Sequence, residues 1–422
     1  MFDPFLVIGA TILLGYFSIA FFDRTKISQV ILLMLFGFIL AHVLGVVDAS
    51  NNSVIISILP FLSTLALIIL LFDAGLTFDV VSVAKSIPRS FLFTLTIFFF
   101  TMLIITLVLW VFFGWPLLYG ALLAAVLGGT SSAIVVAMIE KTRLDKETKS
   151  MLVLESTITD AFCIIFAVFI AQLIALGSTP DFGILTGSLA NSIFMSIVFG
   201  TVSAILWLVI SKRFLISKFS YMLTLSIIFI LYAVTTSSGF NGGLAVFVFG
   251  IIIGNISGLL GLVNIKWGNR ISPTIQFFQG EITFFIRTFF FVYIGLLISP
   301  DYFQFPIVIF AAFLTFLFIV SRSIVSKFFL PSINSAGRNM VVAMMPRGLA
   351  AAVLTTLPLI VAVPIPDFRE LVFVTLLFTN IVATLGVILF DYSPPDDESL
   401  SELEEKDSSN VDKVDEDKDS PS

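Results

Sequence analysis

Two carboxylates, two threonines and a serine occur within six residues of an otherwise apolar stretch, in the run ESTITD from Glu155 to Asp160. Ser156 and Asp160 are four residues apart and share one face of a helix, while Glu155 and Thr159 share the neighbouring strip. The group offers only hard oxygen ligands, which suit small hard cations. A buried carboxylate also binds protons, so a desolvated monovalent cation and a proton would compete for Asp160.

Such competition is sufficient for ion exchange. If the site crosses a membrane only when it is occupied, a cation moves one way and a proton moves the other. Arg347 is the predicted permanent counter-charge of Glu155, and it would keep Glu155 ionised while Asp160 exchanges its proton.

The composition places these residues in a membrane protein. The chain has 422 residues, of which 58% are hydrophobic and 12% are charged, and its mean hydropathy is +1.11. A soluble protein carries roughly 25% charged residues. One cysteine, Cys163, and one histidine, His42, cannot form an internal disulfide or a Cys/His metal cluster. The first apolar stretch follows no basic region, so we expect it to be a retained span.

The sequence predicts an all-α polytopic membrane protein with about thirteen transmembrane helices. Each span needs roughly 20 apolar residues. Such segments lie between charged or Pro/Gly-rich breaks, near residues 4–22, 27–46, 54–72, 90–113, 116–138, 150–175, 185–211, 219–236, 243–264, 276–298, 306–328, 339–361 and 367–389.

Basic residues orient these spans. With the N-terminus outside, the six inner loops hold sixteen Lys and Arg residues and the six outer loops hold only Arg369, in accord with the positive-inside rule. Residues 391–422 carry thirteen acidic residues against three lysines, which predicts a disordered cytoplasmic tail after a membrane domain at 1–390. Five ionisable residues fall within spans, where such groups usually line a water-filled path or pair with one another: Glu155, Asp160, Glu281, Arg287 and Arg347.

The thirteen spans divide into six, one and six, so the halves at about 4–175 and 219–389 would form an inverted repeat joined by the span at 185–211. FGFILAHVLG in the second span resembles FGIIIGNISG in the ninth, and AGL in the third resembles IGL in the tenth. In this frame the fifth span contains LGGTSSA and the twelfth contains MMPRGLAA. Glycine and proline weaken helices. Paired interruptions in two halves of a membrane protein indicate a transporter binding site.

With these motifs in this order, the chain resembles the monovalent cation:proton antiporter superfamily, most closely its archaeal-type NhaP sodium/proton branch. The stretches that carry the resemblance are LFDAGLTFD, GGTSSAIVV, ESTITDA, SGFNGGLAVFVFGIIIGN, FFIRTFFFVYIGLLI and PRGLAAAVL. They cover the membrane body and leave out the acidic tail. The resemblance implies a homodimer, and a core bundle that slides against a dimerisation scaffold with crossed, partly unwound fifth and twelfth spans.

The resemblance also implies roles for individual residues. Asp160 matches the essential transport aspartate, and Arg347 matches the arginine that pairs with the glutamate. Thr159 stands where relatives have asparagine or, in electrogenic relatives, a second aspartate, and Ser131 stands where they often have aspartate. With one aspartate instead of two, the chain resembles an electroneutral one-for-one exchanger of Na⁺ or Li⁺ for H⁺. The predicted ion and proton site comprises Asp160, Glu155, Ser156, Thr130, Thr159 and Ser131, with Na⁺ at the first four of these and Arg347 and Arg287 as ion-pair support.

Other functions remain open at this point. TSSAIVV also resembles the potassium-efflux branch, so a potassium/proton antiporter is the nearest alternative. An intramembrane aspartyl protease needs a second central aspartate, and Asp73 lies at the predicted inner boundary of the third span. A passive channel has no need of a titrating carboxylate. Phosphate loops and nucleic-acid patches are missing from the sequence, so the expected partners are the lipid bilayer of the plasma membrane and a second copy, with no nucleotide, nucleic acid or cofactor.

Overall fold

The computed structural model describes residues 4–25, 28–45, 54–78, 88–139, 142, 144–175, 182–214, 220–255, 273–331, 333, 335–360, 363 and 365–390. The predicted acidic tail lies outside these residues. Every regular element in the described ranges is a helix. This is expected in a bilayer, because a helix satisfies its backbone hydrogen bonds within one segment.

The helices follow the predicted spans. The first half contains α1 (Pro4–Thr25), α2 (Gln29–Phe38) with a π-helical end η1 (Ile39–Val43), α3 (Val54–Thr77), α5 (Pro88–Phe113), α6 (Leu117–Val126), α7 (Ser132–Ile139) and α8 (Lys146–Ala175). The long α9 (Phe182–Phe214) comes next. The second half contains α10 (Ser220–Ser237), α11 (Gly242–Gly254), α13 (Pro273–Leu297), the short 3₁₀ turn η2 (Pro300–Phe303), α14 (Phe305–Phe329), α15 (Ser335–Ala343), α16 (Leu349–Leu354), α17 (Leu357–Ile360) and α18 (Phe368–Phe390).

Seven of the described helices are long and apolar enough to cross a bilayer, namely α1, α5, α8, α9, α13, α14 and α18. The remaining predicted spans fall on the apolar segment Phe61–Thr77 of α3, on shorter apolar helices or on pairs of them. The all-helical, polytopic prediction is therefore confirmed, while the count of thirteen spans stays a prediction.

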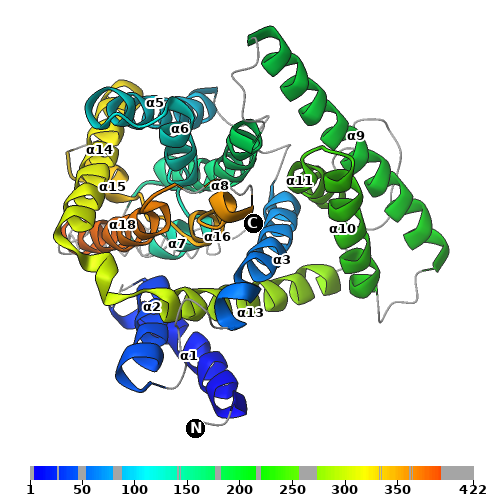
Figure 1. The fold of residues 1–422 in the computed structure, drawn as a ribbon, viewed down its shortest axis with the longest axis horizontal. Coiled ribbons are helices and arrows are strands. Elements are labelled where there is room, and N and C mark those ends of the chain that lie inside the picture. The colour runs from blue at the N-terminus through cyan, green and yellow to red at the C-terminus, as the bar shows by residue number, and fades with distance from the viewer. Residues whose placement is uncertain are drawn as a thin grey trace, which may run out of the picture.

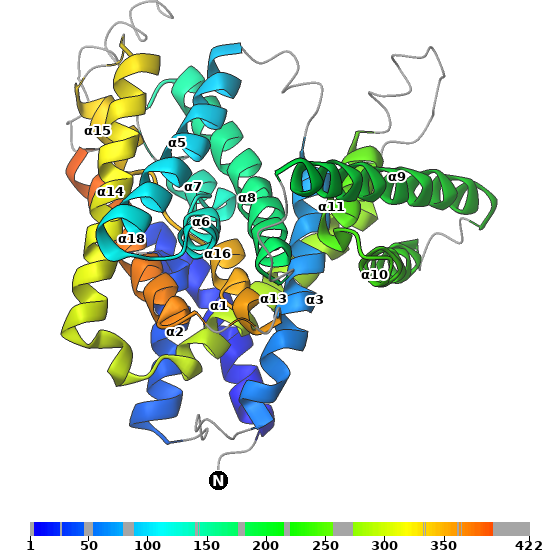
Figure 2. The same cartoon turned by 45° about the horizontal axis from the view of Figure 1, so that its top comes forward.

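The helices form two groups (Figures 1 and 2). One is a bundle of α5, α6, α7, α8, α14, α15, α16 and α18. The other contains α9, α10 and α11 with α3, while α13 runs across the view in Figure 1, above α1, and packs against α3, α1 and α2. Contacts of α16 and α8 with α3 and α11 connect the two groups.

Contacts between the halves have the pattern that an inverted repeat requires. α2 packs against α13, and α3 packs against α11. A Cβ placed on Gly37 would lie 2.9 Å from the Cα of Gly295, and one placed on Gly75 would lie 2.9 Å from the Cα of Gly250. The sequence alignment of the halves equates Gly37 with Gly250 and Gly75 with Gly295. The contact of Gly37 with Gly295 is therefore the repeat-related counterpart of the contact of Gly250 with Gly75. Both contacts let the helix backbones approach closely.

Two helix starts, one in each group, have side-chain caps. The Asp145 carboxylate accepts hydrogen bonds from the backbone amide of Thr148 at 2.8 Å and from its hydroxyl at 2.7 Å, just before α8. The Asn241 side chain accepts a bond from the amide of Leu244 at 2.9 Å at the start of α11. These caps satisfy amides that have no partner within the helix, and they fix where each helix begins.

Candidate ion-binding site

The site forms where two broken helices cross. The chain is unwound between α6 and α7, at residues 127–131, and between α15 and α16, at residues 344–348. The backbone amide of Ser131 donates to the carbonyl of Pro346 at 2.8 Å, so the two unwound segments touch. Both breaks lie at the Gly-Gly and Pro-Arg-Gly sequences that predicted them, and the predicted discontinuous fifth and twelfth spans are confirmed.

Asp160 on α8 faces the start of α7. Its Oδ2 accepts a hydrogen bond from the backbone amide of Ser132 at 2.9 Å and another from the Ser132 hydroxyl at 2.8 Å. Because Ser132 opens α7, the carboxylate also lies at the positive end of a helix dipole. Neutral donors therefore stabilise the ionised carboxylate, and among the described residues both of its hydrogen bonds fall on Oδ2.

A pocket with a volume of about 90 Å³ opens onto Asp160. Helices α1, α2, α3, α7, α8, α13 and α16 supply its walls, and Ser131, Ser132 and Thr157 supply hydroxyl groups beside the carboxylate. Asp160 is half-buried, in contrast to its neighbours on α8. The pocket thus brings a carboxylate and several hydroxyl oxygens to one accessible place, and this donor set suits a hard monovalent cation.

Three of the predicted site residues lie behind this pocket, away from its lining. The backbone amide of Thr130 donates to the Thr159 hydroxyl at 3.1 Å, and the two hydroxyls are 3.3 Å apart. The Ser156 hydroxyl donates to the carbonyl of Val153 on its own helix, at 3.0 Å. Thr130 and Thr159 thus tie the unwound fifth span to α8.

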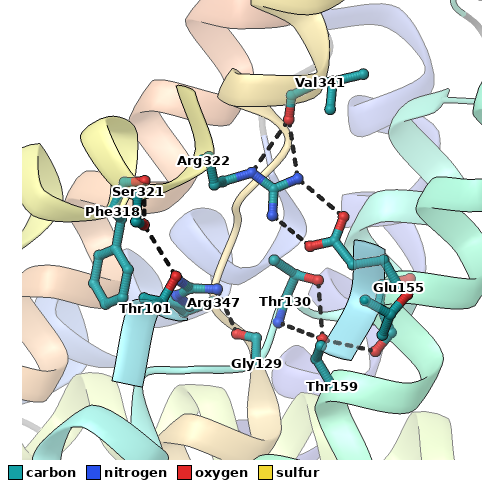
Figure 3. A network of polar contacts seen from close by, with 12 residues as sticks. Thr101, Gly129, Thr130, Glu155, Thr159, Phe318, Ser321, Arg322, Val341 and Arg347 are labelled. Atoms are coloured by element: carbon teal, nitrogen blue, oxygen red, sulfur yellow. Dashed lines mark hydrogen bonds and ion pairs between the residues drawn. The ribbon is translucent and has the colours of Figure 1, made fainter. Parts of the chain in front are cut away.

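Glu155 has a different partner from the one that the sequence analysis expected. Both of its carboxylate oxygens bind the guanidinium of Arg322 on α14, through Nη1 and through Nη2 at 3.0 Å (Figure 3). Arg322 also donates to the carbonyl of Val341 near the end of α15, from Nε at 3.2 Å and Nη2 at 2.9 Å. The expected pairing of Glu155 with Arg347 was wrong. The sixteen basic residues expected in the inner loops include Arg322, near the end of the predicted span at 306–328, whereas it is buried within α14.

Arg347 instead links the two unwound segments where they cross. Its Nη1 donates to the carbonyl of Gly129, three residues past the end of α6, at 2.6 Å, and its Cζ lies 4.2 Å from the centroid of the Phe318 ring. Its backbone carbonyl accepts from the Asn380 side chain at 2.8 Å. The carbonyl ends of the two interrupted helices α6 and α15 therefore each meet an arginine, which offsets the negative end of the helix dipole.

Arg287 lines the same pocket as Asp160. The pocket contains its side chain, from α13, together with Asp73 from α3 and Asp160 from α8, and Arg287 interacts electrostatically with both carboxylates. Glu281, six residues earlier on α13, is exposed. The third span was expected to end before Asp73, but α3 continues to Thr77, so Asp73 belongs to the helix and to the pocket.

Comparison with known proteins shows which family has this architecture. Residues 9–390 match the model of a family described as "Sodium/hydrogen exchanger, transmembrane". The chain belongs to this family. A structure of the sodium proton antiporter MjNhaP1 from Methanocaldococcus jannaschii at pH 8 matches with a TM-score of 0.73 at 20% identity, covering 92% of this chain and 98% of that one. A second structure of MjNhaP1, by electron microscopy, matches with a TM-score of 0.66 at 19% identity, covering 93% and 100%.

The exchanger is thus a multi-pass membrane protein and a sodium/proton antiporter, a transporter and not an enzyme. Sequence reasoning missed four residues of its site. Ser132 directly follows the predicted Ser131, and Thr157 lies within the run ESTITD itself, so counting every hydroxyl residue of the two polar runs would have found both. Arg322 and Asp73 are ionisable residues near predicted span ends, and only the packing of distant helices reveals their place.

Proposed function

We propose that the protein exchanges Na⁺ for H⁺ by competition of the two ions for Asp160. The observation that carries this proposal is the setting of Asp160: a half-buried carboxylate at the crossing of two broken helices, held by the neutral donors of Ser132 and open to the pocket. A cation in the pocket replaces the proton as the partner of the carboxylate. Because the two ions require the same charge, the carboxylate holds one at a time.

The exchange is electroneutral, with one Na⁺ for one H⁺, and Li⁺ is the other cation that the hard oxygen donors favour. The position that carries a second aspartate in electrogenic relatives holds Thr159, whose hydroxyl contacts Thr130. Glu155 is neutralised by Arg322 and does not line the pocket. The crossing therefore offers a single carboxylate for exchange.

Alternating access is supported by a second pocket on the same helices. On α8, Ile164 lines the first pocket and Val168, one turn later, lines the second. On α3, Leu70 lines the first and Leu67 lines the second, and α16 contributes to both. Only about one helical turn of apolar side chains, roughly 5 Å, separates the two pockets. A small displacement of the bundle against α3 would open one pocket and close the other.

The protein acts in the plasma membrane as a homodimer, with its N-terminus outside. Large apolar side chains are exposed along α1 and along α9, where they face lipid or a second copy. The basic loops expected on the inner side set the orientation.

Purified protein in liposomes tests the exchange. Sodium added outside should drive protons across the membrane in the opposite direction, read with a pH-sensitive dye, and Asp160→Asn should abolish the signal while retaining the wild-type elution volume and melting temperature. A potassium gradient with valinomycin should leave the initial rate unchanged, and a panel of Na⁺, Li⁺ and K⁺ identifies the cation. Sodium-driven proton movement that survives Asp160→Asn would refute the proposal.

A further inference from the structure

Ser28 stands at the start of α2, at the position where a serine side chain usually caps its own helix. Its hydroxyl makes no such bond. The hydroxyl donates instead to Oδ1 of Asn380 on α18, 352 positions away in the sequence, at 2.8 Å. Both side chains are fully buried. A residue that could stabilise its own helix is therefore used for a contact between distant helices.

The other end of the Asn380 amide reaches the crossing of the two broken helices. Its Nδ2 donates to the backbone carbonyl of Arg347 at 2.8 Å and to the carbonyl of Leu376, one turn earlier on α18, at 2.8 Å. The amide thus uses its oxygen and its nitrogen at once. Because Arg347 lies in the unwound segment that binds Gly129, Asn380 links the crossing to the start of α2.

The two residues belong to different parts of the fold. α18 is a helix of the bundle, whereas α2 lies beside α1 and packs against α13, which packs against α3 in turn (Figure 1). The proposed alternating access displaces the bundle against α3, and α2 stays with α3 through α13. Apolar side chains can slide past one another, but a hydrogen bond is lost when donor and acceptor separate by about 1 Å. The displacement must therefore break the bond between Ser28 and Asn380.

The bond also belongs to one of the two arrangements. In the structure Asp160 faces the first pocket, which Gln29, the residue after Ser28, also lines. We propose that Ser28 and Asn380 are positioning residues for the exchange: their bond holds the crossing at the first pocket and breaks as Asp160 moves to the second. Neither residue needs to contact the ion. The inference rests on the proposed alternating access and adds a contact that sets the balance between its two arrangements.

Cysteine labelling of the full chain in detergent measures this balance without any need for transport. Cys163, the one cysteine in the sequence, is replaced by alanine. A single cysteine is then introduced by Ala137→Cys in the first pocket or by Gln172→Cys in the second. A water-soluble maleimide labels each cysteine at a rate that follows the fraction of time its pocket is open. The ratio of the two rates, first pocket over second, is therefore proportional to the equilibrium constant between the arrangements.

Loss of the bond should shift the ratio toward the second pocket. Ser28→Ala should lower it about fivefold, because a hydrogen bond between neutral groups changes an equilibrium by about this factor. Asn380→Ala removes the same bond from the other side and should lower the ratio by a similar factor, so the bond is tested even where one variant folds poorly. The double variant Ser28→Ala/Asn380→Ala should lower the ratio no further, because the two changes remove one bond.

Two further variants control the experiment. Ser28→Thr keeps the hydroxyl group and should keep the wild-type ratio, which separates the hydrogen bond from the packing around it. Ser196→Ala removes a buried hydroxyl that bonds within α9, to the carbonyl of Ser192 at 2.7 Å, and should also leave the ratio unchanged.

The outcome distinguishes this inference from the proposed function. A ratio that stays unchanged or rises in folded Ser28→Ala or Asn380→Ala, or shifts that add in the double variant, would overturn the roles of Ser28 and Asn380 while exchange through Asp160 stands. A wild-type protein that exchanges no cation would overturn the proposed function, whereas a ratio that falls in Ser28→Ala would still show that the bond holds one arrangement.

Discussion

The ion pair of Glu155 and Arg322 allows a direct test of what stabilises the helix bundle. The change is Arg322→Gln, which removes a guanidinium that binds both oxygens of a buried carboxylate and also donates twice to the carbonyl of Val341. Leaving one partner of a buried ion pair alone costs about 3–5 kcal/mol. The reverse change, Glu155→Gln, leaves Arg322 with the Val341 carbonyl, so its cost should lie at the lower end of this range.

Thermal unfolding in detergent measures this loss. For a chain of this size we expect the apparent melting temperature of Arg322→Gln to fall by about 5 °C. Because membrane proteins unfold irreversibly, all variants must be heated at one scan rate. The double variant Glu155→Gln/Arg322→Gln, which leaves no unpaired charge, should recover at least half of the loss.

Arg347→Gln provides the matched comparison. It removes a charged hydrogen bond to Gly129 and the stacking on Phe318, worth about 2 kcal/mol together, and it should show little coupling to Glu155→Gln. The reasoning is wrong if Arg322→Gln melts with the wild type, or if Glu155→Gln couples more strongly to Arg347→Gln than to Arg322→Gln.

Two further predictions concern the neighbours of the site. Ser132→Ala removes one of two hydrogen bonds that stabilise the ionised Asp160 carboxylate over its protonated form. Because a bond to a charged group contributes about 1.5 kcal/mol, protons should compete about tenfold better, so KM for Na⁺ should rise about tenfold at acidic pH and change little at alkaline pH. Ser226→Ala on an exposed face of α10 is the control, and an unchanged KM in Ser132→Ala at acidic pH would count against this contact. Burial raises the pKa of Asp145, but the bonds from Thr148 outweigh burial and hold that pKa below its ordinary value. The stabilisation by Asp145 is therefore present above about pH 4 and lost as the pH falls through the lowered pKa. Asp145→Ala should cost about 1 kcal/mol at pH 7 and progressively less as the pH is lowered below about 4, measured by thermal unfolding at a series of pH values, and a cost that does not change with pH would contradict this prediction.

The sequence was most informative where the bilayer restricts the choices. Apolar length and basic loops located every described helix, because a span must be continuous and its backbone must be satisfied internally. The breaks at Gly128–Gly129 and at Pro346 were predictable because these residues disfavour a helix wherever they lie. The aligned glycines at Gly37 and Gly250 pointed to the repeat.

The ion-pair partner of Glu155 was not predictable from the sequence in the same way. α14 has 25 residues, and a helix of this length, about 37 Å, is longer than the hydrocarbon core. A basic residue near its predicted end, such as Arg322, therefore reads as a loop charge although it is buried. Its partner Glu155 is 167 positions away, and only the packing of α14 against the rest of the bundle brings the two together.

The contrast between Glu155 and Asp160 explains why we infer a single exchanging carboxylate. A proton that reached Glu155 would displace a guanidinium bound to both oxygens, and it would leave the charge of Arg322 unpaired in a dry interior, at a cost of several kcal/mol. Among the described residues, the hydrogen-bond donors to Asp160 are neutral, and its carboxylate faces the pocket, so a proton or a cation can replace the other there without leaving a buried charge alone. Five residues apart on α8, the two carboxylates thus have separate functions: Glu155 holds the bundle together, and Asp160 exchanges its ion.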